Sequence, residues 1–234
     1  MPAKRAPLYL IASGRGSGRA RGDDPVLREI VGVVNVPRPT IAYVGAASGD
    51  NAAFRVMIGH MLQKAGAGKV VLAPLCGRKA DPERATEVLK SAHIVFISGG
   101  DVEEGMKVLN ETGMIAVLRA LARAGKPFFG ISAGSIMLAS QWVRWTDPDD
   151  DASAELFPCL GFAKVLCDTH GEGEGWGELK AMLALCPVGS IGYGIASGST
   201  LKMDGDGNVA ALGGAVDVFR RRKSGVVPAE SLKP

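Results

Sequence analysis

The chain has 234 residues, and its 27 Lys and Arg against 24 Asp and Glu give a net charge of +3. This length suits one α/β domain and is short for two. With 47% hydrophobic residues the chain can bury a core, which excludes disorder as its main state. The small charge predicts no nucleic-acid partner. No apolar run reaches the roughly eighteen residues that a membrane span needs, and no signal-peptide core follows the amino terminus. We therefore expect a cytoplasmic protein without a membrane partner.

The chain contains few residues that could hold a metal. The four cysteines form no C-x-x-C pair, and there are only three histidines, His60, His93 and His170. A zinc site needs closer pairing than this. We expect reduced, structural cysteines and no metal or organic cofactor.

In the first half, short apolar runs alternate with amphipathic stretches. The runs predicted as strands are Leu8–Ala12, Thr40–Val44, Lys69–Leu72, Ile94–Ser98 and Phe128–Ile131. Helices are predicted between them over Val26–Val34, Phe54–Lys64, Arg84–Lys90 and the stretch around Leu118–Ala122, the first and third preceded by Asp-Pro caps. Alternating strands and helices predict a doubly wound, mostly parallel sheet flanked by helices.

The second half is predicted to be richer in strands. A helix over Ala133–Trp142 and an acidic loop over Thr146–Glu155 precede a strand at Ala163–Asp168 and a helix at Trp176–Leu185. Four short strands then follow, Ile191–Ala196, Thr200–Met203, Val209–Leu212 and Val216–Phe219, with Asp204–Gly207 as a hairpin turn. We expect a single domain over residues 1–234, with flexible ends at 1–7 and 221–234.

The segment Gly130-Ile131-Ser132-Ala133-Gly134 lies where a predicted strand meets a predicted helix. In that context G-x-S-x-G is typical of a nucleophile elbow, in which a sharp turn between small residues exposes the serine hydroxyl. The amide of Ala133 would then point to the same place from the helix N-terminus. The alternative is a tight turn in which Ser132 only caps the helix.

Two further features lie at candidate ligand positions. Gly99 and Gly100, followed by Asp101, come directly after a strand, where backbone amides can approach a ligand and donate to an oxyanion, unless this is an ordinary turn. Among the histidines, His60 lies within a helix and His93 begins a strand at the opposite edge. His170 ends a strand and enters a Gly-rich loop, so by elimination it is the candidate general base.

Taken in order, these features resemble the serine peptidases typified by peptidase E and cyanophycinase, over roughly Leu8 to Phe219. The resemblance includes the turn with Gly14, Gly16 and Gly18, the Gly99–Asp101 turn, the Gly130–Gly134 segment, Asp168-x-His170 and the ending Gly192–Leu201. The same first glycines lack the G-x-G-x-x-G spacing of a dinucleotide site. The resemblance implies a flavodoxin-like, class I glutamine amidotransferase-like fold with a C-terminal β-hairpin.

The resemblance also implies roles for individual residues. Ser132 matches the nucleophile and His170 the base, while Ala133 with Gly99 or Gly100 matches the oxyanion donors. Asp147 matches the orienting acid of peptidase E. In cyanophycinase that acid is a glutamate near the carboxyl terminus, but Ala196-Ser197 stands here where Asp-Glu is expected. The chain therefore uses Asp147 or lacks a third member, whose loss can reduce turnover about ten-thousandfold.

Other positions depart from the family pattern. Val102 follows Asp101 where a polar group is usual near the substrate, and Glu172 and Glu174 follow His170 where aromatic residues and arginine are usual. An acidic loop favours a substrate with a cationic group, unless it is simply solvated.

Two functions follow as hypotheses. The first is a serine-type hydrolase cleaving short peptides or isopeptide-like amides, with a small peptide as substrate and a homodimer allowed. The alternative is a catalytically weak or inactive amidotransferase-like domain that binds a small ligand or a protein partner.

Overall fold

The structure is a computed structural model that describes residues 5–13 and 24–234. Gly14, Gly16 and Gly18, which belong to the family resemblance, lie outside the described residues, as do residues 1–4.

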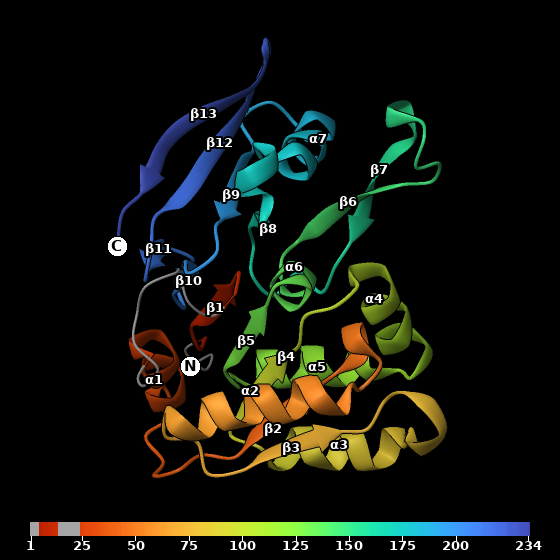
Figure 1. The fold of residues 1–234 in the computed structure, drawn as a ribbon, viewed down its shortest axis with the longest axis vertical. Coiled ribbons are helices and arrows are strands. Elements are labelled where there is room, and N and C mark those ends of the chain that lie inside the picture. Colours follow the sequence, from red (N-terminus) through yellow and green to blue (C-terminus); the bar gives the residue numbers. More distant parts are fainter. Residues whose placement is uncertain (1–4, 14–23) are drawn as a thin grey trace.

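A mostly parallel sheet forms the centre of the fold (Figure 1). Its strands within the described residues are β1 (Leu8–Ile11), β2 (Ile41–Val44), β3 (Val70–Ala73), β4 (Ile94–Ile97), β5 (Phe128–Ile131), β10 (Thr200–Met203) and β11 (Val209–Leu212). The order across the sheet is β11-β10-β1-β5-β4-β2-β3. The five strands from β1 to β3 run parallel, whereas β10 and β11 are antiparallel and form the predicted hairpin. The predicted fold class is confirmed.

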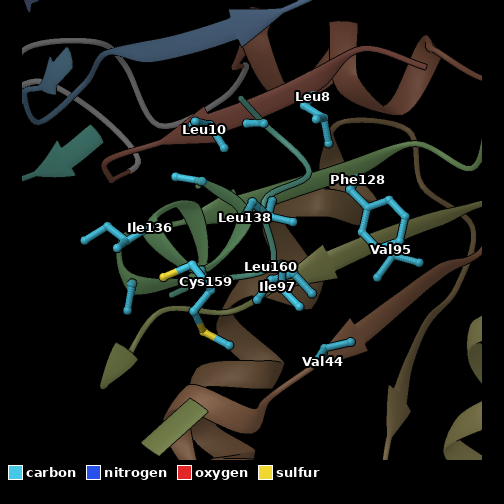
Figure 2. Packing of buried hydrophobic residues seen from close by; sticks show 14 of the residues in the cluster. Leu8, Leu10, Val44, Val95, Ile97, Phe128, Ile136, Leu138, Cys159 and Leu160 are labelled. Carbon is cyan, nitrogen blue, oxygen red and sulfur yellow. The ribbon is translucent and has the colours of Figure 1, made fainter. Parts of the chain in front are cut away.

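Helices cover both faces of this sheet, because its strands are apolar on both sides. On β1, Leu8 and Leu10 belong to one core cluster, and Tyr9 and Ile11 to the other. Helices α1 (Pro25–Gly32) and α2 (Ala52–Lys64) contribute to the second cluster. Helices α3 (Pro82–Ser91), α4 (Val102–Glu111), α5 (Met114–Arg123) and α6 (Ala133–Leu138) contribute to the first. In Figure 2, Ile136 and Leu138 of α6 pack among strand residues such as Leu10, Ile97 and Phe128.

A second, smaller sheet stands above the first in Figure 1. It contains β8 (Leu166–Thr169), β9 (Ile191–Ile195), β12 (Val216–Arg222) and β13 (Gly225–Leu232), in the order β13-β12-β9-β8, with β8 and β9 parallel. Helix α7 (Gly177–Leu185) packs on this sheet and against a hairpin of β6 (Gln141–Trp145) and β7 (Ala154–Pro158). The short 3₁₀ helices are η1 (Ala46–Ser48), η2 (Gly77–Lys79), η3 (Asp151–Ser153) and η4 (Gly171–Glu174).

The helix after β5 is shorter than predicted. It ends at Leu138, because Ala139 adopts an extended conformation, and Gln141–Trp145 pairs with Ala154–Pro158 as the β6–β7 hairpin. Aromatic and β-branched residues such as Trp142 and Val143 favour a strand here. The acidic segment predicted as a loop is the tip of this hairpin. Helix α4, which no predicted element covered, starts at an Asp101 cap.

The predicted flexible end at 221–234 is wrong for most of its length. Residues 225–232 form strand β13, which pairs antiparallel with β12 through a two-residue turn. Val226 packs against the α7 cluster and Leu232 against the main core. The polar composition concealed a strand because β13 is an edge strand with one solvent-exposed side.

No helix in the described part of the chain is long and apolar enough to span a membrane.

Candidate active site

Ser132 lies at a strained turn between β5 and α6. Its φ of 53° and ψ of −125° fall outside the regions favoured by residues other than glycine. Such a conformation costs about 1–3 kcal/mol and persists only where the surrounding structure enforces it. The side chain makes no capping hydrogen bond to α6, so the interpretation of Ser132 as a mere helix cap is wrong. Its hydroxyl is half-buried and has no hydrogen-bond partner among the described residues.

The two glycines of the G-x-S-x-G segment are required by close backbone packing. A Cβ on Gly130 would lie 2.4 Å from the carbonyl oxygen of Gly134, and a Cβ on Gly134 would lie 2.2 Å from that of Ile97. Any side chain at these positions would force β5, α6 and β4 apart. The backbone N–H of Ser132 donates to the carbonyl of Ile11 at 2.8 Å, which anchors the turn to the end of β1.

The turn after β4 lies directly beside Ser132, because β4 and β5 are parallel neighbours whose carboxyl ends coincide. A Cβ on Gly99 would lie 3.1 Å from the Ser132 Cβ and 3.7 Å from its Oγ. Gly100 has a φ of 140°, and a Cβ there would lie 1.9 Å from the Ala47 carbonyl oxygen, so only glycine fits.

Three backbone amides around this turn are available to a ligand. The amides of Gly99 and Gly100 donate no hydrogen bond within the described residues. The amide of Ala133 is at the first position of α6, where a helix offers no internal acceptor. Asp101 differs: its backbone N–H donates to the Ala47 carbonyl, and its carboxylate accepts the Glu104 N–H at 2.8 Å. Asp101 therefore serves as the N-cap of α4.

His170 follows β8 in a left-handed conformation, with a φ of 65°. Its backbone N–H donates to the Ile195 carbonyl, which extends the pairing of β8 with β9 by one residue. Its side chain is exposed, and Nδ1 lies 3.3 Å from Oγ of Ser197. The backbone N–H of Ser197 donates to Oε1 of Glu172 at 3.1 Å.

The elements that carry Ser132 and His170 contact each other, since β8 packs against α6. Over the described ranges no hydrogen bond joins the two side chains. The other two histidines lie elsewhere. Nδ1 of His93 accepts the Thr40 N–H at 3.0 Å, a structural role, and His60 is exposed on α2.

Asp147 lies at the exposed tip of the β6–β7 hairpin. Its Oδ1 accepts the Asp149 N–H at 3.1 Å, and its backbone N–H donates to the Ser153 hydroxyl at 3.0 Å. No hydrogen bond connects it to His170 in the part of the chain that the structure describes. The side chain beside Nδ1 of His170 is therefore that of Ser197. In the sequence this position indicated only that the expected glutamate is missing, and it did not predict a contact with His170.

The surroundings of His170 are acidic. Burial, together with the charge of Glu178, raises the pKa of Asp168 to about 7. Desolvation acts to raise the pKa of Glu172 as well, but hydrogen bonds from Ser197 and the charge of His170 outweigh it and lower that pKa. Glu172 is therefore ionised at neutral pH and accepts a hydrogen bond from Ser197, while Asp168 can hold a proton.

No group of three or more His, Cys, Asp or Glu side chains within residues 5–13 and 24–234 is arranged to hold a metal ion. The four cysteines are free thiols.

The chain is similar to peptidases in both sequence and fold. The model of peptidase family S51 matches residues 8–209. A crystal structure of a peptidase from an acI-B1 Actinobacterium has a TM-score of 0.66 at 18% identity, covering 98% of this chain and 97% of that one. A putative peptidase E protein from Listeria monocytogenes has a TM-score of 0.58 at 15% identity, covering 88% and 97%. These structures show a shared fold.

Curated relatives match more distantly. Pyridoxal 5'-phosphate synthase subunit PdxT of Anoxybacillus flavithermus is 25% identical over 154 residues, which is 66% of this chain and 71% of that protein. The PdxT subunit of Geobacillus sp. is 33% identical over 120 residues, 51% of this chain and 57% of that protein. Imidazole glycerol phosphate synthase subunit HisH 2 of Legionella pneumophila is 32% identical over 90 residues, 38% and 39%. The fold is consistent with the peptidase E and glutamine amidotransferase-like architecture.

Proposed function

The chain belongs to peptidase family S51, and on that basis we propose that it is a serine hydrolase that cleaves short peptides or isopeptide-like amides through an acyl-enzyme on Ser132. The observation that carries the proposal is the strained turn at Ser132 with its unbonded hydroxyl. A strained backbone that exposes a hydroxyl beside free backbone amides serves no purpose in packing, but it is the arrangement that acyl transfer needs.

The proposed reaction proceeds in two stages. Nε2 of His170 accepts the Ser132 proton while Oγ attacks the substrate carbonyl, and the amides of Ala133 and of Gly99 or Gly100 hold the resulting oxyanion. The C–N bond then breaks, and the leaving amine takes the proton from His170. In the second stage water gives a proton to His170 as its oxygen attacks the ester carbonyl. The bond between that carbon and Ser132 Oγ then breaks, His170 returns the proton to Oγ, and the acid is released. No step requires a metal or an organic cofactor.

Substrates with a cationic group fit the charge around His170 best. Glu174 is exposed on the same loop as Glu172, and Asp168 and Glu178 add to the acidic surroundings. Like charges repel, so a substrate carboxylate would be disfavoured here, whereas a free amino terminus or a basic side chain would be attracted. Hydrolysis of matched lysyl, arginyl and aspartyl dipeptides tests this. We expect higher kcat/KM for the basic peptides, and none with Ser132→Ala; a preference for aspartyl peptides would reject the specificity.

The second candidate is a domain that binds a ligand or partner without turnover. One observation favours it: among residues 5–13 and 24–234, no carboxylate is hydrogen-bonded to Nδ1 of His170, which lies beside the Ser197 hydroxyl. A fluorophosphonate probe separates the candidates because it reacts only with an activated serine. Stoichiometric labelling that is lost in Ser132→Ala and reduced in His170→Ala supports the hydrolase. Folded protein that stays unlabelled supports the binding domain.

A further inference from the structure

A histidine that acts as a base toward Ser132 must present the lone pair of Nε2, so its proton must be on Nδ1. That Nδ1–H then needs an acceptor. In this structure the group at Nδ1 is the Ser197 hydroxyl, at 3.3 Å. A hydroxyl can accept this hydrogen bond, but it has no charge with which to stabilise the imidazolium that forms when His170 takes the Ser132 proton.

A negative charge lies on the residue that Ser197 itself contacts, Glu172. Oε1 of Glu172 accepts the backbone N–H of Ser197 at 3.1 Å. The Ser197 side chain is close enough to this carboxylate to help its backbone N–H lower the pKa of Glu172, although burial alone would raise it. Glu172 thus remains ionised beside the pair formed by Ser197 and His170.

The local fold explains why three residues so far apart in sequence meet. Parallel pairing of β8 with β9 places Thr169 opposite Ile195, so the next residues along each strand, His170 and those leading to Ser197, leave the sheet together. His170 takes a left-handed conformation and opens the short helix η4, which turns the chain back within two residues. Glu172 is carried by that turn to the Ser197 amide.

We propose that Ser197 and Glu172 together replace the orienting acid, with the Nδ1–H of His170 donating to Ser197 Oγ and the Ser197 hydroxyl donating to the Glu172 carboxylate. Both are positioning residues, since neither touches the reacting atoms. The proposal rests on the proposed function for its catalytic meaning, but the hydrogen-bond arrangement can be tested separately. Asp147 takes no part in this hydrogen-bond arrangement, because its carboxylate accepts the Asp149 N–H at the tip of the β6–β7 hairpin.

Removing Ser197 or Glu172 should slow the reaction less than removing a buried carboxylate that contacts the histidine directly. The relay formed by His170, Ser197 and Glu172 is exposed to solvent. Water can therefore replace part of its hydrogen bonding when one of these residues is removed. Removing a direct orienting acid costs about ten-thousandfold. For the exposed, indirect relay we expect roughly a ten- to hundredfold loss in the rate constant for fluorophosphonate labelling.

The kinetic test compares Ser197→Ala, Ser197→Thr, Glu172→Gln, Asp147→Asn and Glu87→Gln across pH 5 to 9. We expect the loss in Ser197→Ala and Glu172→Gln, recovery in Ser197→Thr, which keeps the hydroxyl, and no change in Glu87→Gln, an exposed glutamate on α3 that is the matched control. In Glu172→Gln the pH at which half the labelling rate is lost should move to a lower value, since the imidazolium loses its counter-charge. A loss confined to Asp147→Asn would overturn the proposal.

A second measurement is independent of activity. Nitrogen-15 spectra of the three histidine rings, assigned with His170→Gln, report which nitrogen carries the proton. We expect the Nδ1–H form for neutral His170 and a shift toward the Nε2–H form in Ser197→Ala. The Nε2–H form in the unmodified protein would overturn the relay. If no labelling occurs, the proposed hydrolase fails while this spectrum still decides the hydrogen-bond arrangement.

Discussion

The hydroxyl of Ser135 joins the first strand of the sheet to the turn that holds Ser132. Its Oγ accepts the backbone N–H of Ile11 at 2.8 Å and lies 2.8 Å from the carbonyl oxygens of both Ile11 and Gly130, to one of which it donates. The side chain is fully buried. One hydroxyl therefore provides the hydrogen-bond acceptor at the end of β1 and holds α6, the helix that follows Ser132, against that strand.

Replacing Ser135 should weaken both the fold and the site. Ser135→Ala leaves the buried Ile11 N–H without an acceptor, which costs about 1–3 kcal/mol. We expect a loss of that size in the free energy of unfolding measured with urea, with slower fluorophosphonate labelling because the turn is less constrained. Ser91→Ala, which removes an exposed hydroxyl bonded to the Val88 carbonyl, is the control and should change neither. Equal stability of the two variants would contradict this role.

Gly99→Ala should impair the site more than the fold. The added Cβ would lie 3.1 Å from the Ser132 Cβ and 3.2 Å from the Ile131 carbonyl oxygen, a tight contact that small shifts relieve at a cost of about 1–3 kcal/mol. Those shifts move Ser132 relative to the amides that would hold the oxyanion. We expect at least a tenfold slower labelling of folded protein. Gly32→Ala, where a Cβ meets nothing within 4 Å, should label normally.

Asp168 should make stability fall as pH rises. Its pKa is about 7 in the folded protein, raised mainly by burial, against about 3.9 when unfolded. The folded state then binds the extra proton between these values, so the contribution of Asp168 to stability is greatest below about pH 4 and decreases until about pH 7. A shift of about 3 pH units corresponds to about 4 kcal/mol.

The Asp168→Asn variant tests this dependence because its side chain is neutral at every pH. Urea unfolding at pH 5 and pH 8 should show the variant gaining stability relative to the unmodified protein at pH 8. Asp147→Asn, at an exposed position, supplies the control for a general change in charge. Identical pH dependence of the unmodified protein and Asp168→Asn would exclude a raised pKa for this carboxyl.

Strand β13 should be needed for stability. A chain that ends at Arg222 loses one of the two strands that pair with β12 and leaves β12 as an unpaired sheet edge, which promotes aggregation. We expect a lower Tm and concentration-dependent aggregation, visible by light scattering. A chain shortened only by residues 233–234, which lie beyond the strand, should melt like the complete one. Unchanged melting of the longer truncation would restore the prediction of a flexible end.

The main sheet could be predicted from sequence because its strands are buried on both faces. Runs such as Phe128–Ile131 and Ile94–Ile97 are apolar throughout, and Asp-Pro caps mark the starts of α1 and α3. Helix α4 was missed because the Gly-Gly-Asp sequence before it was interpreted as a ligand turn, although Asp101 serves as the helix cap. Strand β6 was missed because its first residues were assigned to the helix predicted over Ala133–Trp142. Strand β13 was missed because the basic residues 220–223 before it indicated a polar, frayed tail.

The serine turn could be predicted for the same kind of local reason. Small residues at 130 and 134 are dictated by contacts within and beside the turn, so they leave a short pattern in the sequence. The environment of His170 could not be predicted, because it depends on the register of β8 with β9, which brings Ser197 within 3.3 Å of Nδ1 from 27 residues away. Nothing local to either residue signals this contact.

Mass spectrometry after fluorophosphonate treatment tests the central claim most directly. The tryptic peptide from Ala124 to Arg144 contains Ser132 together with Ser135 and Ser140, two internal controls. The account predicts a single adduct per folded chain, located by fragmentation on Ser132. An adduct on Ser135 or Ser140, or folded protein without any adduct, would contradict it.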